Sequence, residues 1–121
     1  MQSTLRRVLV VDDHAPLLKA LKSLLEDFRC DVACCSSGTE AIEELSRHPY
    51  DVVLMDYQMP GLTGAETFRR LRPHHPGACF IGMSADDREQ AFLAAGADAF
   101  VSKWDVDALP SIVLHHHGET A

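Results

Sequence analysis

The chain has 121 residues, a length typical of one folded domain, and 46% of them are hydrophobic, enough for a core without disulfide or metal staples. It carries 11 basic and 18 acidic side chains, and the largest run of basic residues is Arg69, Arg70 and Arg72. A net charge of −7 argues against direct binding to nucleic acid or to an anionic membrane surface. No apolar run approaches the ~20 residues of a membrane span, and no signal peptide precedes the first expected strand, so we expect a cytoplasmic protein.

Apolar runs and amphipathic stretches alternate from the start of the chain. Val8–Val11 is entirely apolar, as is typical of a strand buried on both faces, and it ends at Asp12 and Asp13. Leucines at three- and four-residue steps then predict a helix over 17–28. Residues 31–35 predict a second strand.

The second expected helix begins at a capping box, with Ser37 as the N-cap and Glu40 three residues later, and it ends before Pro49. Val52–Met55 is another fully apolar run, and it again ends in an acid, Asp56. The third expected strand therefore ends in the same way as the first.

The remaining elements repeat the alternation. They are a helix over 63–71, a strand over 79–83 ending at Ser84, a helix over 86–95 closed by Gly96, a strand over 99–101 and a last helix over 106–115, which Pro110 is expected to disturb. Five strand–helix units with short connections predict an α/β fold, a parallel sheet with helices on both faces. No linker or repeat divides the chain, so we expect a single domain over 1–121 with a core over about 6–117.

Five polar residues stand where such sheets bind ligands, beyond the carboxyl ends of the strands. They are Asp12, Asp13, Asp56, Ser84 and Lys103. Three carboxylates held close together repel one another unless a cation compensates, and a hard divalent ion, Mg²⁺ above all, suits oxygen ligands. This set suits phosphoryl transfer onto the Asp56 carboxylate, with the Lys103 ammonium and the Ser84 hydroxyl sharing the phosphoryl charge.

Four motifs in order resemble the receiver domain of bacterial response regulators, over nearly the whole chain: residues 10–13 (VVDD), 56–64 (DYQMPGLTG), 83–85 (MSA) and 96–103 (GADAFVSK). The resemblance implies a flavodoxin-like, doubly wound (βα)5 fold with five parallel strands in the order 2-1-3-4-5. It also implies a phosphorylation-activated signalling switch rather than an enzyme. A histidine kinase or histidine phosphotransfer protein would donate the phosphoryl group to Asp56, with Mg²⁺ or Mn²⁺ as the cofactor.

The same resemblance assigns roles to individual residues. Phosphorylation is expected to draw Ser84 toward the new anion and to let Phe100 turn inward, which remodels the face formed by the fourth helix, fifth strand and fifth helix. That face would bind the output partner or a second copy of the chain. The implied metal ligands are Asp13, Asp56 and the backbone carbonyl of Gln58, with Asp12 acting through water, and the implied phosphoryl ligands are Ser84 and Lys103.

Two positions depart from the family pattern. Phe100 stands where many members have tyrosine, so no hydroxyl is available to hydrogen-bond in the inward state. Trp104 stands where the family usually has proline after the lysine, which predicts either a trans bond with an altered loop or a cis bond costing ~2.5–4 kcal/mol. An exposed Trp104 at this place would be an anchor for a partner.

Several alternatives stay open at this stage. A phosphatase of the haloacid-dehalogenase-like class also uses an aspartate nucleophile and Mg²⁺, but it normally has a second aspartate where this chain has Gln58. A degenerate receiver would act as a constitutive interaction domain. The acidic pair at 12–13 and Ser84 could also be plain helix caps. The chain begins with Met1, which favours a stand-alone regulator over a piece of a larger protein, while the kinase, the output and the oligomeric state are not encoded.

Overall fold

The computed structural model describes residues 5–115 and contains a sheet of five parallel strands in the order β2-β1-β3-β4-β5, which confirms the expected fold. Residues 116 and 117, the end of the expected core, lie outside the described part. The strands are β1 (Arg6–Val11), β2 (Cys30–Cys35), β3 (Val52–Asp56), β4 (Cys79–Ser84) and β5 (Ala99–Ser102). The helices are α1 (Ala15–Asp27), α2 (Gly38–Arg47), α3 (Gly64–Leu71), α4 (Glu89–Ala94) and α5 (Leu109–His115), with 3₁₀ helices η1 (Arg72–His74) and η2 (Lys103–Ala108).

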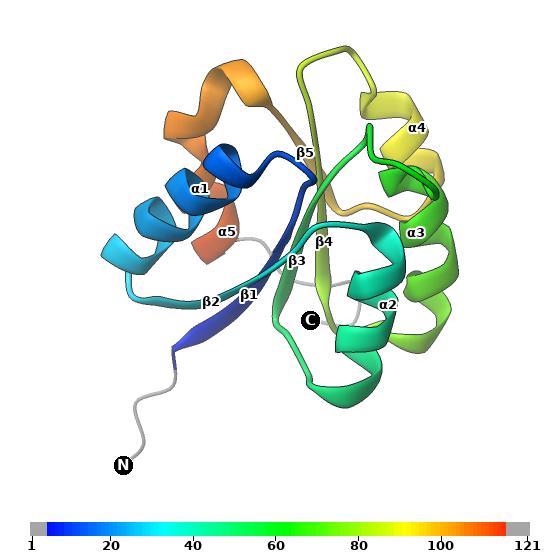
Figure 1. Cartoon of the computed structure of the whole chain (residues 1–121), viewed down its shortest axis with the longest axis horizontal. Helices are drawn as coiled ribbons and strands as arrows, with labels where there is room; N and C mark the ends of the chain where they lie inside the picture. Colours follow the sequence, from blue (N-terminus) through cyan, green and yellow to red (C-terminus); the bar gives the residue numbers. More distant parts are fainter. Residues whose placement is uncertain (1–4, 116–121) are drawn as a thin grey trace.

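Helices cover both faces of the sheet, with α1 and α5 on one face and α2, α3 and α4 on the other (Figure 1). Successive strand side chains point to opposite faces, so each strand contributes to two cores. In β1, Leu9 and Val11 pack in the cluster with Phe68 of α3, whereas Val8 and Val10 pack in the cluster on the α1 and α5 side. No helix among the described residues is long and apolar enough to cross a membrane.

The N-terminal cap of α2 differs in part from the sequence prediction. The Ser37 side chain accepts the Glu40 backbone N–H at 3.1 Å, as predicted, but the Glu40 carboxylate accepts from the backbone and hydroxyl of Ser36 rather than from Ser37. The reciprocal half of the predicted box is therefore wrong. A complete capping box forms instead at α3, between Thr63 and Glu66.

The helix expected to begin at Asp86 begins instead at Glu89, so its predicted start is wrong by three residues. The reason is local: the Ser84 hydroxyl accepts the Asp86 backbone N–H at 3.1 Å, which holds the chain in a turn. The predicted end is confirmed, because Gly96 follows α4 with φ +101°, a conformation that favours glycine.

The last helix is also shorter than expected, since 103–108 forms the 3₁₀ helix η2 and α5 covers only Leu109–His115. Pro110 does not disturb α5, because it is buried in the first turn, where its missing N–H has no intrahelical partner to lose. Within residues 5–115 no peptide bond is cis, so Lys103 and Trp104 are joined by a trans bond.

Candidate functional site

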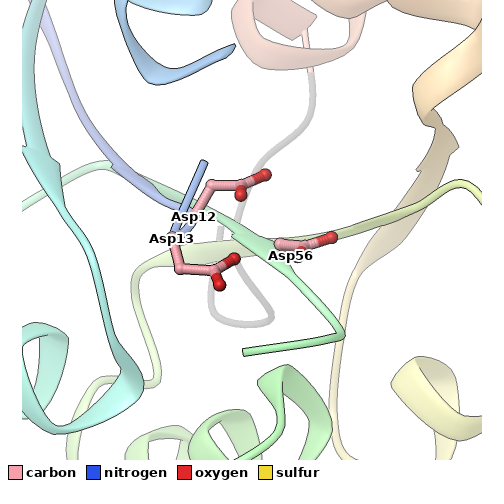
Figure 2. Close-up of side chains that lie close together, drawn as sticks. All are labelled: Asp12, Asp13 and Asp56. Atoms are coloured by element: carbon pink, nitrogen blue, oxygen red, sulfur yellow. The ribbon is translucent and has the colours of Figure 1, made fainter. Parts of the chain in front are cut away.

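Three carboxylates gather at the carboxyl ends of two neighbouring strands (Figure 2). Asp12 and Asp13 follow β1, and Asp56 is the last residue of β3. One oxygen from each carboxylate lies within 4.8 Å of the others. Asp12 is fully buried and Asp56 is 4% exposed, whereas Asp13 is exposed to solvent. The parallel pairing of β1 with β3 puts the two strand ends side by side, and this is why the separate motifs converge.

Lys103 follows β5 at the same edge of the sheet and reaches over the end of β4 to the carboxylates. Its Nζ lies 2.9 Å from Oδ2 of Asp12 and 3.0 Å from Oδ1 of Asp56. Only 22% of its side chain is exposed, so the ion pairs are partly shielded from water.

The pocket shifts the ionisation of its own residues. Burial raises the pKa of Asp56, and the charges of Asp12 and Asp13 add to this, while the hydrogen bond from Lys103 opposes it. Burial lowers the pKa of Lys103, but the hydrogen bonds and charges of Asp12 and Asp56 together outweigh it, so the pKa is raised. The ammonium therefore stays charged at neutral pH, and one cation faces three carboxyl groups.

The donor set fits a hard divalent cation. Oδ1 of Asp12 accepts the His14 backbone N–H at 2.9 Å, but Oδ2 is buried without a well-directed hydrogen bond and has only the ion pair with Lys103. Asp13 lines a pocket of about 310 Å³ together with Gln58, Met59 and Pro60. A cluster of three carboxylates beside an open pocket, with one buried oxygen that lacks a hydrogen bond, suits Mg²⁺.

Ser84 and Phe100 lie on the neighbouring strands β4 and β5. Ser84 is the last residue of β4, is 5% exposed, and does not cap α4, since that helix begins five residues later. Phe100 is half-buried in β5, and its ring centroid lies 6.0 Å from that of Phe92. The structure thus brings Asp12, Asp13, Asp56 and Lys103 together and puts Ser84 at the end of the strand beside Asp56.

Phe92 of α4 is a fully buried residue that sequence reasoning missed. Its ring lies 5.8 Å from the ring of Tyr57, the neighbour of Asp56, and also packs near Phe68 and Phe100. It lies on Gly82 of β4, where an added Cβ would overlap the ring. A glycine within an otherwise apolar strand is the signal that predicts such a close approach.

Replacing Lys103 by methionine is expected to lower the free energy of unfolding by about 2 kcal/mol at neutral pH, because two poorly hydrated carboxylates lose their cation. The control is Lys22→Met, which breaks an exposed pair with Glu26 and a hydrogen bond to the Val32 carbonyl and should cost clearly less than the change at Lys103. Chemical denaturation with and without MgCl₂ measures both variants. A loss at Lys103 no larger than at Lys22 would show that the amine does not neutralise the pocket.

The chain is similar to a small part of several sensor kinases. The autoinducer 2 sensor kinase/phosphatase LuxQ of Vibrio cholerae is 38% identical over 125 residues, covering 96% of this chain and 14% of that protein. The signal transduction histidine-protein kinase BarA of Escherichia coli is 34% identical over 102 residues, covering 79% of this chain and 11% of that protein.

Solved structures of response regulators share the fold. The protein TrrA of Thermotoga maritima, solved in complex with Mg²⁺-BeF, gives a TM-score of 0.85 at 28% identity over 91% of this chain and 97% of that one. The Francisella response regulator 1452 receiver domain gives 0.84 at 28% identity, covering 90% and 93%. The family model for the response regulator receiver domain matches residues 8–113. These matches agree with the observed fold and acidic pocket, and the chain belongs to the response regulator receiver domain family of two-component signalling.

Proposed function

We propose that the protein is a switch that accepts a phosphoryl group on the Asp56 carboxylate. The observation that carries this proposal is the Lys103 ammonium, which lies 3.0 Å from Asp56 and 2.9 Å from Asp12 inside an acidic pocket. An ammonium that bridges these two carboxylates can stabilise negative charge as it grows on the acceptor.

The chemistry requires no general base, because the Asp56 carboxylate is the nucleophile in its ionised form. A carboxylate oxygen attacks the phosphorus, the bond from phosphorus to the donor nitrogen breaks, and its electron pair leaves with the donor imidazole. Lys103 then binds a phosphoryl oxygen. Ser84 accepts the Asp86 N–H through a lone pair, which leaves its own hydroxyl proton available for another phosphoryl oxygen.

Asp13, Asp56 and the Gln58 backbone carbonyl would hold Mg²⁺, or Mn²⁺ in its place, with Asp12 acting through water. The relative TrrA, solved with Mg²⁺-BeF, and the acidic cluster of this chain support the assignment. The bound ion supplies charge neutralisation between the carboxylates and the incoming phosphoryl oxygens. The switch would couple Ser84 to Phe100 and remodel the face of α4, β5 and α5, through which an output partner or a second copy binds.

The donor we propose is a histidine kinase or a histidine phosphotransfer protein of the cytoplasm. The curated relatives support it, because they are sensor kinases in which a segment like this one is a small part. We also propose that residues 1–121 form one receiver domain.

The decisive test removes the metal. The protein incubated with acetyl phosphate or phosphoramidate and MgCl₂ should gain the mass of one phosphoryl group, and EDTA should slow this by about 100-fold or more. No gain with Mg²⁺ would instead indicate a constitutive interaction domain. Steady turnover of p-nitrophenyl phosphate would favour the haloacid-dehalogenase-like phosphatase, which the residue Gln58 two positions after Asp56 argues against.

A further inference from the structure

Trp104 has the most exposed large hydrophobic side chain of the described residues, at 84%. Its indole is nevertheless fixed in place, because Nε1 donates to the Ala85 carbonyl at 3.2 Å. Its backbone N–H donates to the Ser102 hydroxyl at 3.1 Å. A large ring that is already ordered loses little conformational entropy when a partner covers it, and tryptophan is the side chain most enriched among residues that dominate binding energy.

Four exposed carboxylates belong to residues close in sequence to Trp104 or to the carbonyl that its indole contacts. Asp86 and Asp87 directly follow the carbonyl that the indole contacts, and Asp105 and Asp107 lie on η2, which carries Trp104. None of the four makes an ion pair with another residue in the range 5–115.

The two cations nearest in sequence are engaged elsewhere. Lys103 is turned into the acidic pocket, where it pairs with Asp12 and Asp56. The Arg88 guanidinium lies over the Tyr57 ring, 4.5 Å from its centroid. The ring and its four acids are therefore exposed to solvent as an anionic aromatic surface, and neither of these two cations pairs with the acids among residues 5–115.

We propose that this surface, made of Trp104, Asp86, Asp87, Asp105 and Asp107 and called here the Trp104 surface, docks a partner protein segment that carries two or more basic side chains. An arginine would stack on the indole, where a cation gains from the ring quadrupole, and its neighbours would pair with the carboxylates. Anionic lipids and nucleic acid are repelled by the same charges. An apolar helix would need a wider apolar patch than a single ring between acids.

This docking does not depend on phosphorylation of Asp56, so it is tested on the unmodified chain. The probes are two fluorescein-labelled peptides of equal charge, one alternating arginine with serine and the other lysine with serine, and binding is followed by fluorescence anisotropy. The arginine peptide is expected to bind about twofold to fivefold more tightly than the lysine peptide.

Trp104→Ala should remove that preference and weaken binding of the arginine peptide about fivefold or more. Phe28→Ala, the matched control at another exposed ring, should change neither value.

A second pair of variants separates a specific surface from the attraction of an acidic protein for any polycation. Asp105→Asn with Asp107→Asn should weaken the arginine peptide by about tenfold at ~0.05 M salt, and much less at ~0.5 M. Asp27→Asn with Glu43→Gln removes the same charge from exposed positions on α1 and α2 and should change binding by less than about twofold. Equal weakening in both pairs, or unchanged binding in Trp104→Ala, would overturn the proposal.

Discussion

Replacing Asp56 by asparagine is expected to abolish phosphoryl incorporation from acetyl phosphate, because a neutral amide oxygen is too weak a nucleophile to form the acyl phosphate. Intact-mass spectrometry after incubation with MgCl₂ measures the effect. Asp51→Asn is the matched control, since Asp51 precedes the opposite end of β3 and its carboxylate binds the Arg7 backbone. If the Asp56 variant incorporated phosphoryl groups at the wild-type rate, another residue would be the acceptor.

The same variant should make the metal-free protein more stable. Burial raises the pKa of Asp56 above its ordinary value of 3.8, so the ionised carboxylate disfavours the folded state. That cost is fully present above the folded-state pKa and disappears below the unfolded-state pKa. We expect a gain of about 1 kcal/mol at neutral pH, shrinking as the pH falls toward 3.8. Urea unfolding in EDTA at several pH values measures it, and a loss of stability would show that the pair with Lys103 outweighs burial.

Replacing Arg72 by methionine is expected to lower the free energy of unfolding by about 4 kcal/mol, because it leaves a poorly exposed carboxylate and several carbonyls without their donor. Arg72 pairs with Asp98 at 3.0 Å, and its guanidinium lies 4.3 Å from the centroid of the Phe80 ring. Asp98 in turn accepts the Phe80 backbone N–H at 2.8 Å. The carbonyls that accept from the guanidinium belong to Gly96, His75, Pro76 and Ala78.

Arg70→Met is the control for Arg72, since Arg70 is exposed on α3 and should cost under ~0.5 kcal/mol. Guanidinium chloride unfolding compares the two variants. A second comparison uses Arg72→Met combined with Asp98→Asn, which removes the stranded charge and should recover part of the loss. Equal costs at Arg70 and Arg72 would mean that the network contributes nothing to stability.

The fold and the acidic pocket could be predicted because both depend on short-range patterns. Apolar runs such as Val8–Val11 mark strands that are buried on both faces. Residues that directly follow such runs must meet at one edge of a parallel sheet, and so Asp12, Asp56 and Lys103 converge as expected.

What the sequence could not predict depends on side chains that reach across the fold. Arg72 reads as part of a basic surface run with Arg69 and Arg70, but its guanidinium turns inward to Asp98, the residue before β5. The start of α4 depends on a hydrogen bond from Asp86 to Ser84, because the turn it closes delays the helix. Neither the direction of a long side chain nor the competition between a turn and a helix is visible in residue spacing.

The contact between Phe92 and Gly82 has a consequence for how a signal could leave the pocket. The Phe92 ring lies directly on the backbone of β4, since glycine has no side chain to hold it away, and it also packs near Phe100 and Tyr57. An inward turn of Phe100 would bring its ring against Phe92, and the Phe92 ring is already in contact with the β4 backbone and cannot move closer to it. If the proposed switch operates, we therefore expect α4, which carries Phe92, to move as a body.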